Sequence, residues 1–494
     1  MTIDRPAGPA RCVMVLGTTS GAGKSWLATA LCRWYARQGL RVAPFKAQNM
    51  SNNARVVAGG EIGSAQYFQA LAARAQPEVR MNPLLLKPER DTHSQVVLMG
   101  QVDAELSAVP WRERSERVWP FITDALDALR AENDLVVIEG AGSPAEINLM
   151  ANDIVNLRVA RHADARCLLV TDIDRGGAFA HLYGTWALMP PADRARLAGF
   201  VLNRFRGDAT LLAPAPEQLR QLTGVPTLAT LPMWREHGLP EEDGVFDEAA
   251  GGQADGERRF FTVAVIAYPR ISNLDEFRPL GNVPGLRLRW ARSPSELDGA
   301  DWVILPGSKN TSGDLAWLRS RGLDRAVAAH AARGGAVLGI CGGLQMLGEA
   351  LIDPHGIDGN GPGLGLLPLV TVFEQAKTVR QREARFGELA GPWAALSGLS
   401  LSGYEIHHGQ TAEHAAMAAA GDRARAVMPD ELAWQGGAGG QVLGLYLHGL
   451  FEDAGVLRAL FGVAARSLDS VFDGLADYID SYFEAGALRR LISP

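Results

Sequence analysis

Short apolar runs alternate with helix-length stretches along most of this 494-residue chain. In the first half, the β-rich runs are CVMVLG, RVAPFK, LVVIEGAG, RCLLVTDID and GFVLNRF, at residues 12–17, 41–46, 135–142, 166–174 and 199–205. Strands that are apolar throughout and separated by helices are typical of a parallel sheet covered on both faces. The pattern therefore predicts an α/β fold.

The alternation is interrupted once, which divides the chain in two. Residues 236–259 are acidic, rich in glycine and without periodicity, as expected for a linker. A second series of apolar runs follows: FFTVAVIAY, WVILPG, AVLGIC and VLGLYLH. Because the chain is too long for one hydrophobic core, we predict two α/β domains, at residues 1–235 and 260–494, joined by the linker 236–259.

Composition argues against several classes of protein. The net charge of −7 is unlike that of a nucleic-acid-binding protein. Four scattered cysteines with no CxxC pair do not suggest a structural metal or a disulfide framework. The N-terminus has no signal-peptide pattern, and no apolar run reaches the ~18 residues that span a membrane. We expect a cytoplasmic protein whose partners are neither nucleic acid nor membrane.

The stretch GTTSGAGKS, at residues 17–25, lies between a predicted strand and a predicted helix. Small residues let backbone N–H groups converge on a phosphate, and a helix start adds its dipole. The predicted phosphate-binding residues are Gly17, Thr18, Gly21, Gly23 and Lys24, with the Ser25 hydroxyl as a Mg²⁺ ligand. The glycine spacing is one residue longer than the usual P-loop, so the alternative is a glycine turn with a chance Lys-Ser pair.

Charged residues stand at the ends of the predicted strands. Glu139 follows LVVI, where an acid is well placed to hold a metal ion, because ligands gather at the carboxyl ends of parallel strands. Its alternative role is to cap the next turn. Lys46 follows RVAPF, and Asp172 and Asp174 follow RCLLV. Together these residues predict a charged rim suited to phosphoryl transfer.

The second half contains a candidate nucleophile, Cys341. The order Gly339-Ile340-Cys341-Gly342-Gly343 is that of an elbow in which a strand turns sharply into a helix. The N–H of Gly342, with a donor near Gly307 in LPGSKNT, would form an oxyanion hole. A thiol needs a base, and His448 at the end of VLGLYLH is the candidate. The alternatives are a buried structural cysteine and a core histidine.

These motifs resemble two known groups. With PGSKNT, GICGGLQMLG, YEIHHG and LYLHGLFED, the second half resembles the flavodoxin-like class I glutamine amidotransferase domains. The first half resembles the dethiobiotin synthetase group, whose phosphate loop has this longer spacing. The stretches FKAQNMSNNA, MNPLLLKPERDTHSQVVLMG, VVIEGAGSPAEINL and TDIDRGGAFAHLYGT are similar to the cobyric acid synthase family, in which the two domains are fused. The sister cobyrinic acid a,c-diamide synthases are the alternative.

The resemblance implies an ATP- and glutamine-dependent carbon–nitrogen ligase of cobalamin biosynthesis. Its substrate would be adenosylcobyrinic acid a,c-diamide, amidated at the b, d, e and g carboxylates. Mg²⁺ would be held by Ser25 and Glu139, and Asn203 in VLNRF would recognise adenine. Cys341 would form a thioester with glutamine while His448 moves protons.

Two points remain open at the level of sequence. Related amidotransferases have a glutamate two residues after the histidine, where this chain has Leu450. Either Glu405 in GYEIHHG replaces it, or the Cys–His pair works without an acid. A P-loop ATPase switch of the partitioning type is a rival of another class. Such proteins carry a lysine near the loop start, where this chain has Thr18 and Thr19, and they lack a glutaminase domain.

Overall fold

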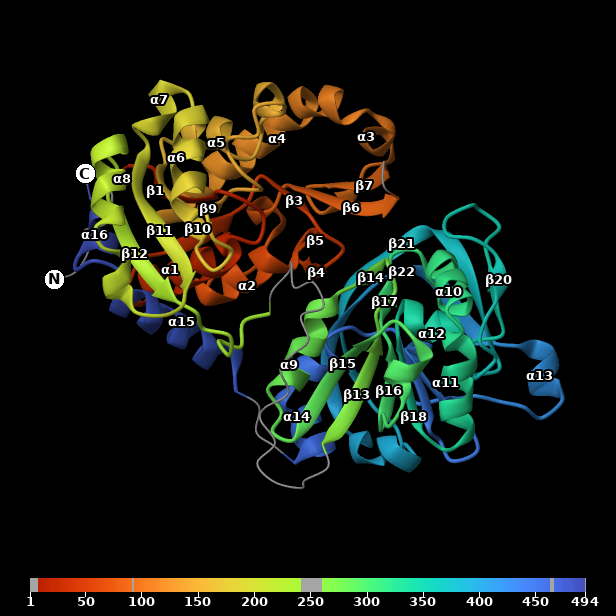
Figure 1. The fold of residues 1–494 in the computed structure, drawn as a ribbon. Coiled ribbons are helices and arrows are strands. Elements are labelled where there is room, and N and C mark those ends of the chain that lie inside the picture. Colours follow the sequence, from red (N-terminus) through yellow and green to blue (C-terminus); the bar gives the residue numbers. More distant parts are fainter. Residues whose placement is uncertain (1–7, 91–92, 241–259, 463–465, 494) are drawn as a thin grey trace. The chain divides into compact units, whose positions relative to one another are not determined.

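The structure is a computed structural model that describes residues 8–90, 93–240, 260–462 and 466–493. The chain forms two compact units (Figure 1). The first unit consists of Met1–Ser51, Val57–Asp243 and Ser467–Pro494, and the second of Asn52–Val56 and Gly244–Arg466.

A parallel six-stranded sheet forms the centre of the first unit, in the order β12-β11-β10-β1-β9-β2. Its strands are β1 (Arg11–Gly17), β2 (Val42–Phe45), β9 (Leu135–Glu139), β10 (Arg166–Asp172), β11 (Leu197–Phe205) and β12 (Thr227–Pro232). All the apolar runs predicted as strands in the first half belong to this sheet. The sequence prediction of a parallel α/β sheet is therefore confirmed.

Both faces of this sheet are covered by helices because its strands are apolar on both sides. Met14 and Leu16 of β1 belong to the core on one face, together with residues of α4. Val13 and Val15 belong to the core on the other face, together with residues of α1 and α15. The main helices are α1 (Lys24–Arg37), α2 (Ser64–Ala72), α4 (Trp111–Glu132), α5 (Leu157–His162), α6 (Ala178–Leu188), α8 (Ala215–Thr223), α15 (Leu468–Tyr482) and α16 (Ala487–Arg490).

A smaller four-stranded sheet completes the first unit. Its order is β3-β6-β7-β8, and its strands are β3 (Gln48–Met50), β6 (Leu84–Arg90), β7 (His93–Leu98) and β8 (Gln101–Val102). Leu84 and Leu86 of β6 and Val96 of β7 are buried in the core that α4 also lines. This sheet therefore shares a hydrophobic core with the six-stranded sheet.

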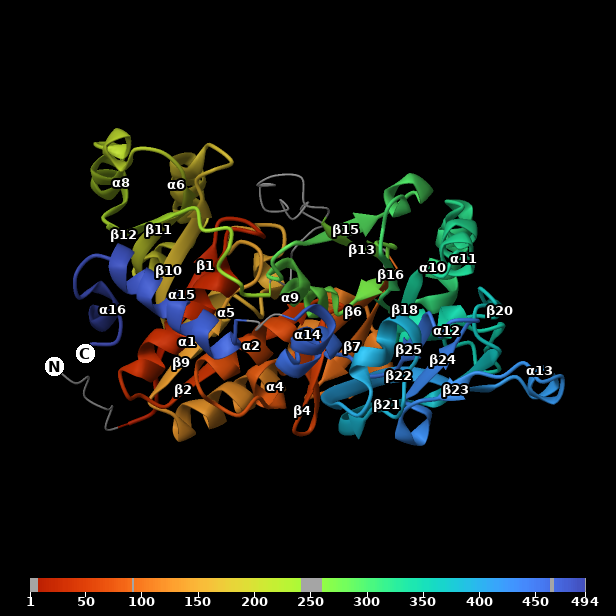
Figure 2. The same cartoon turned by 90° about the horizontal axis from the view of Figure 1, so that it is seen from below.

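The sequence prediction placed the last helices of the chain in the domain of residues 260–494. In the structure, these helices belong to the first unit. Helix α15 lies alongside α1 (Figure 2). The Arg33 side chain donates from Nε to Asp473 at 2.8 Å, and the Tyr35 hydroxyl donates to the Leu488 carbonyl at 2.6 Å. Phe472 is buried in the same core. Of the predicted linker, residues 241–259 lie outside the described residues.

The second unit is built on a seven-stranded sheet in the order β15-β13-β16-β18-β25-β24-β23. These strands are β13 (Phe261–Ile266), β15 (Leu286–Ala291), β16 (Trp302–Leu305), β18 (Ala336–Ile340), β23 (Arg425–Ala426), β24 (Ala433–Gly436) and β25 (Val442–Leu445). The first five in sheet order are parallel, β24 pairs antiparallel with β25, and β23 pairs antiparallel with β24. Each apolar run predicted in the second half contributes one strand.

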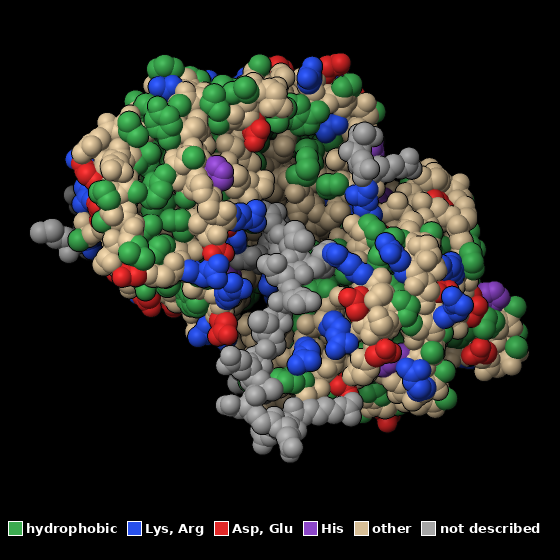
Figure 3. All heavy atoms as spheres, viewed as in Figure 1, with side chains coloured by type: hydrophobic (Ala, Val, Ile, Leu, Met, Phe, Trp, Pro, Cys, Tyr) green, Lys and Arg blue, Asp and Glu red, His purple; other side chains and the backbone are tan. Residues whose placement is uncertain are grey.

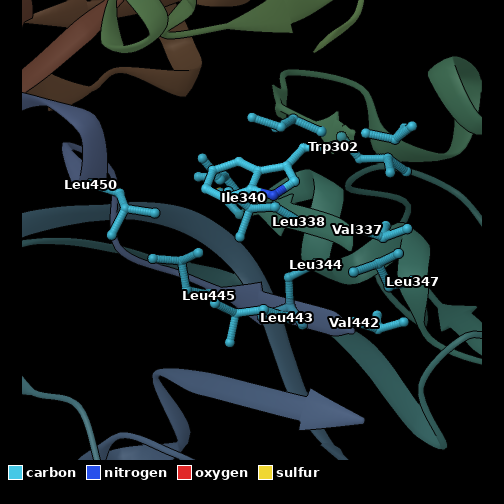
Figure 4. Packing of buried hydrophobic residues seen from close by; sticks show 14 of the residues in the cluster. Trp302, Val337, Leu338, Ile340, Leu344, Leu347, Val442, Leu443, Leu445 and Leu450 are labelled. Carbon is cyan, nitrogen blue, oxygen red and sulfur yellow. The ribbon is translucent and has the colours of Figure 1, made fainter. Parts of the chain in front are cut away.

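Helices cover this second sheet too, and its core is apolar. They include α9 (Arg278–Gly281), α10 (Thr311–Ser320), α11 (Leu323–Ala332), α12 (Gly342–Leu347) and α14 (Ala454–Phe461). Figure 4 shows side chains of β16, β18, β25 and α12 packed together in this core. A long antiparallel pair, β21 (Leu369–Arg385) and β22 (Ser400–Glu413), joins β19 (Ala350–Ile352) and β20 (Gly361–Pro362) in a separate sheet.

The surface of the second unit carries both signs of charge. On the face that Figure 3 presents, lysine and arginine side chains are interspersed with aspartate and glutamate. Within the part of the chain that the structure describes, no helix has the length and apolar character needed to cross a membrane.

Candidate active sites

The predicted phosphate loop connects β1 to α1 in the first unit. Gly23 precedes the helix with φ 100°, and Gly21 has φ 71°, so both adopt a left-handed conformation that suits glycine. Lys24 donates from Nζ to the Thr19 carbonyl at 2.9 Å and to the Gly142 carbonyl at 3.1 Å. A Cβ at position 17 would lie 2.9 Å from Lys24 Nζ. The glycines therefore leave room for the lysine to fold back over the loop, as a phosphate cradle requires.

Glu139, at the end of β9, is buried at the centre of a polar cluster. Its Oε1 accepts from Ser25 Oγ at 2.8 Å and from Lys46 Nζ at 2.7 Å, and its Oε2 accepts from Gln69 Nε2 at 2.5 Å. Burial raises the pKa of Glu139, but Lys46 and the hydrogen bonds from Ser25 and Gln69 outweigh it and lower the pKa. The structure thus brings together Ser25, Lys46 and Glu139, which the sequence placed 114 positions apart at most.

Two further predicted residues lie at the same loop. Asn203 donates from Nδ2 to the Ala22 carbonyl at 3.0 Å, and a Cβ at Gly23 would lie 2.1 Å from that nitrogen. Thr18 donates from its hydroxyl to the Thr171 hydroxyl at 3.0 Å. Asn203 is therefore in direct contact with the phosphate loop.

Among the described residues, no three His, Cys, Asp or Glu side chains are grouped so that they could hold a metal ion.

Cys341 occupies a strained turn between β18 and α12 in the second unit. Its φ of 51° and ψ of −104° are unusual for a residue with a side chain. Its N–H donates to the Leu445 carbonyl at 2.8 Å, and its Sγ lies 3.6 Å from the Ile406 carbonyl oxygen. A Cβ at Gly343 would lie 1.9 Å from the Leu305 carbonyl oxygen, so only glycine fits there. The elbow geometry expected for a nucleophile is present.

His448 follows β25 and is held by a buried carboxylate. Its Nδ1 lies 3.0 Å from Oε1 of Glu276, whose Oε2 accepts from the Gly449 N–H at 3.0 Å. Glu276 lies in η4 (Leu274–Phe277), and its side chain is fully buried. The Tyr404 ring stacks on the His448 ring, with centroids 5.2 Å apart. Carboxylate and ring together fix the orientation of the imidazole.

The surroundings of His448 determine its charge. Burial lowers the pKa of an imidazole, but the Glu276 carboxylate and a hydrogen bond with the Cys341 thiol raise the pKa of His448 to about 10. The ring is therefore held as an imidazolium at neutral pH. An imidazolium beside a cysteine stabilises the thiolate, which is the reactive form.

Gly307, in β17 (Gly307–Ser308), and Gly342, at the start of α12, lie beside His448 and Cys341. A Cβ at Gly307 would lie 2.9 Å from Cε1 of His448, and a Cβ at Gly342 would lie 2.8 Å from the Ser308 nitrogen. Gly342 is the first residue of α12, where N–H groups have no partner within the helix. The two glycines thus lie close to Cys341 and His448.

Glu405, the acid suggested by the sequence for His448, has other partners. Its carboxylate accepts from Arg380 Nε at 2.7 Å and lies 3.0 Å from His407 Nε2. The acid that the structure places beside His448 is therefore Glu276 and not Glu405.

Glu276 was missed because it lies 172 positions from His448. The one available signal was the acidic pair in NLDEF, shortly after the carboxyl end of the strand FFTVAVIAY. A parallel sheet gathers functional groups at that edge. Several other acids meet the same criterion, however, so the sequence alone did not single out Glu276.

Together, the two sites define a class of protein: a glutamine amidotransferase domain on the same chain as a nucleotide-binding domain. Residues 262–456 match the family of CobB/CobQ-like glutamine amidotransferase domains, and residues 13–242 match the CobQ/CobB/MinD/ParA nucleotide binding domain.

Curated proteins similar to the chain include the cobyric acid synthase of Variovorax paradoxus, which is 79% identical over 98% of this chain and 99% of its own length. The cobyric acid synthase of Polaromonas naphthalenivorans is 74% identical over 98% of this chain and 100% of its own length. The chain belongs to the cobyric acid synthase family. The family predicted from its motifs is confirmed.

Proposed function

We propose that this chain converts the b, d, e and g carboxylates of adenosylcobyrinic acid a,c-diamide into amides, with ATP as the activating agent and glutamine as the nitrogen source. The relatives named above carry this family's name, which supports the substrate class. Its four cysteines are all unpaired, which is usual in a reducing compartment, and we place the reaction in the cytoplasm.

The first unit would activate the carboxylate. A carboxylate oxygen attacks the γ-phosphorus of ATP, the bond to the β-phosphate oxygen breaks, and an acyl phosphate and ADP result. Lys24, folded over the loop at Gly17, would bind the terminal phosphates, with Thr18, Gly21 and Gly23 forming the rest of the cradle. Asn203, in contact with the loop at Ala22, would bind adenine.

Ser25 and Glu139 are oxygen donors of the kind that Mg²⁺ prefers, and they already lie within hydrogen-bond distance of each other. The donor set therefore fits this ion, which when bound would neutralise charge on the phosphoryl oxygens. Lys46, which donates to Glu139, would contribute its positive charge beside the phosphates.

The second unit would release ammonia from glutamine. The Cys341 thiolate attacks the side-chain carbonyl carbon, the N–H groups of Gly342 and Gly307 bind the oxyanion, and His448 gives a proton to the departing nitrogen. Water then hydrolyses the thioester to glutamate and the free thiol. Ammonia attacks the acyl phosphate carbon and displaces inorganic phosphate, giving the amide.

The observation that carries this proposal is the strained Cys341 elbow beside the buried Glu276–His448 pair. A structural cysteine would not need a left-handed turn, and a core histidine would not need a buried carboxylate partner.

The test is a mass-resolved product assay with ATP, Mg²⁺ and adenosylcobyrinic acid a,c-diamide. Wild type with glutamine should give four successive mass losses of about one unit each, since each amidation replaces OH by NH₂. Cys341→Ala should give none with glutamine and all four with ammonium. Amidation of cobyrinic acid instead would identify an a,c-diamide synthase. ATP turnover that needs no corrinoid would favour the ATPase switch.

A further inference from the structure

A short piece of the first half of the chain belongs to the second unit. Residues Asn52–Val56, which we call the arm, are part of the second unit, whereas Ser51 and Val57 on either side are part of the first. Residues 52–54 of the arm end the stretch FKAQNMSNNA, one of those similar to the cobyric acid synthase family, and neither of the two sites described above uses the arm.

The arm is fixed within the second unit by hydrogen bonds of its backbone and of the Asn53 side chain. The Ala54 N–H donates to Asn273 Oδ1 at 2.9 Å, and the Leu274 N–H donates to Asn53 Oδ1 at 3.0 Å. Gln381 donates from Nε2 to the Val56 carbonyl at 2.9 Å. Two of these hydrogen bonds hold the arm against the segment that carries Glu276, and the third holds it against β21.

Within the arm, Arg55 is buried and bound to two acids. Its Nη2 forms an ion pair with Asp275 and lies 2.6 Å from Oε1 of Glu452, while its guanidinium lies 5.2 Å from the centre of the Tyr404 ring. Burial raises the pKa of Glu452, and the charge of Arg55 opposes that shift. Replacing Arg55 would leave Asp275 and Glu452 without their counter-charge, which costs free energy of folding.

The partners of Arg55 lie next to Glu276 and His448. Asp275 immediately precedes Glu276, and Glu452 ends η8 (Leu450–Glu452), which begins directly after Gly449. The Gly449 N–H donates to Glu276, and Tyr404 stacks on His448. Arg55 thus contacts the segment that carries Glu276, the segment that follows His448, and the Tyr404 ring that stacks on the imidazole.

We propose that Arg55 is a positioning residue for glutamine hydrolysis, which bridges Asp275 and Glu452 so that Glu276 stays on His448. The proposal rests on the proposed function of the second unit. Without the guanidinium, the buried carboxylates of Asp275 and Glu276 and the half-buried carboxylate of Glu452 lie together without a counter-charge, so they repel one another or take up protons. Either response moves Glu276 from the imidazole, and the active glutaminase therefore depends on a residue from the first half of the chain.

The experiment compares Arg55→Met and Arg55→Lys with wild type in the full-length chain. Two rates are measured for each: release of glutamate from glutamine, and corrinoid amidation with ammonium as nitrogen source. We expect Arg55→Met to lower kcat for glutamine hydrolysis about 100-fold, because a misplacement of ~1 Å costs this much. KM for glutamine and the ammonium-driven rate should stay near wild type, and Arg55→Lys should recover part of kcat.

Arg33→Met is the matched control. Arg33 is also a buried arginine paired with two acids, Asp469 and Asp473, but it lies in the first unit. We expect it to lower thermal stability while glutamine hydrolysis keeps its kcat. If Arg55→Met does not fold, the proposal is tested by measuring the same two rates, glutamate release and ammonium-driven amidation, for Arg55→Lys and Asp275→Asn.

The inference is overturned if Arg55→Met hydrolyses glutamine at the wild-type kcat, or if the ammonium-driven rate falls by the same factor, which would indicate a general loss of folding. A wild-type protein that amidates with ammonium but releases no glutamate would instead overturn the proposed function of the second unit. These failures are distinguishable because the first appears only in the variant.

Discussion

The imidazole of His448 is hydrogen-bonded through Nδ1, at 3.0 Å, to Glu276, a residue 172 positions earlier in the chain. The position two residues after the histidine is filled by Leu450, which is fully buried in the core. The carboxylate therefore reaches the ring from a different segment, and the Cys–His–acid arrangement is complete without a glutamate beside the histidine.

Glu276→Gln should separate the two nitrogen sources. The amide keeps the volume of the side chain but lacks the charge that holds His448 as imidazolium, so we expect glutamine-dependent kcat to fall about 10²-fold. Amidation with ammonium should be unaffected, as measured in parallel assays. Glu405→Gln is the control, because Glu405 binds Arg380 and His407. An equal loss in Glu405→Gln would contradict the assignment.

The titration of His448 should be displaced to high pH. We expect its ring to titrate near pH 10 in the NMR spectrum of histidine-labelled protein, against an ordinary pKa of 6.5. Because the folded-state pKa is raised, the stabilisation is complete below about pH 6.5 and is lost as pH rises from there to about 10. In Glu276→Gln the pKa should be lower and the decline smaller. Titration of His448 near pH 6.5 in wild type would rule this out.

Glu139 should matter for stability as well as for activity. Glu139→Gln leaves the Lys46 ammonium buried without its carboxylate, and breaking such a buried pair costs about 3–5 kcal/mol. Ser25→Ala removes one hydrogen bond to the same carboxylate and should cost about 1 kcal/mol. Urea unfolding followed in the first unit measures both. Equal costs for the two variants would show that the ion pair contributes little.

Helix α15 should stabilise the first unit and not the second. Phe472→Ala opens a cavity in the core that α15 shares with α1, at a cost of about 3–5 kcal/mol. Limited proteolysis should then cleave the first unit faster and leave the second unchanged. Leu457→Ala, in α14 of the second unit, is the control: it should make the second unit easier to cleave and leave the first unchanged. Faster cleavage of the second unit in Phe472→Ala would contradict the observed division of the chain.

Much of the fold could be predicted from local patterns. Strands such as β10 and β18 are apolar on both faces and stand between helices, so their type and the parallel sheet follow from composition and spacing alone. The phosphate loop and the Cys341 elbow are likewise contiguous in sequence, because small residues are needed where the backbone turns sharply. These features required no knowledge of which distant segments meet.

What only the tertiary structure decided is which distant residues come together. Glu276 on His448, Arg55 among the acids beside it, and α15 on the first unit are each set by the packing of segments far apart in the chain. Many acids and apolar helices in the sequence satisfy the same local criteria. Only the folded core fixes the distances, and a carboxylate orients a histidine or neutralises an arginine only within a few ångströms.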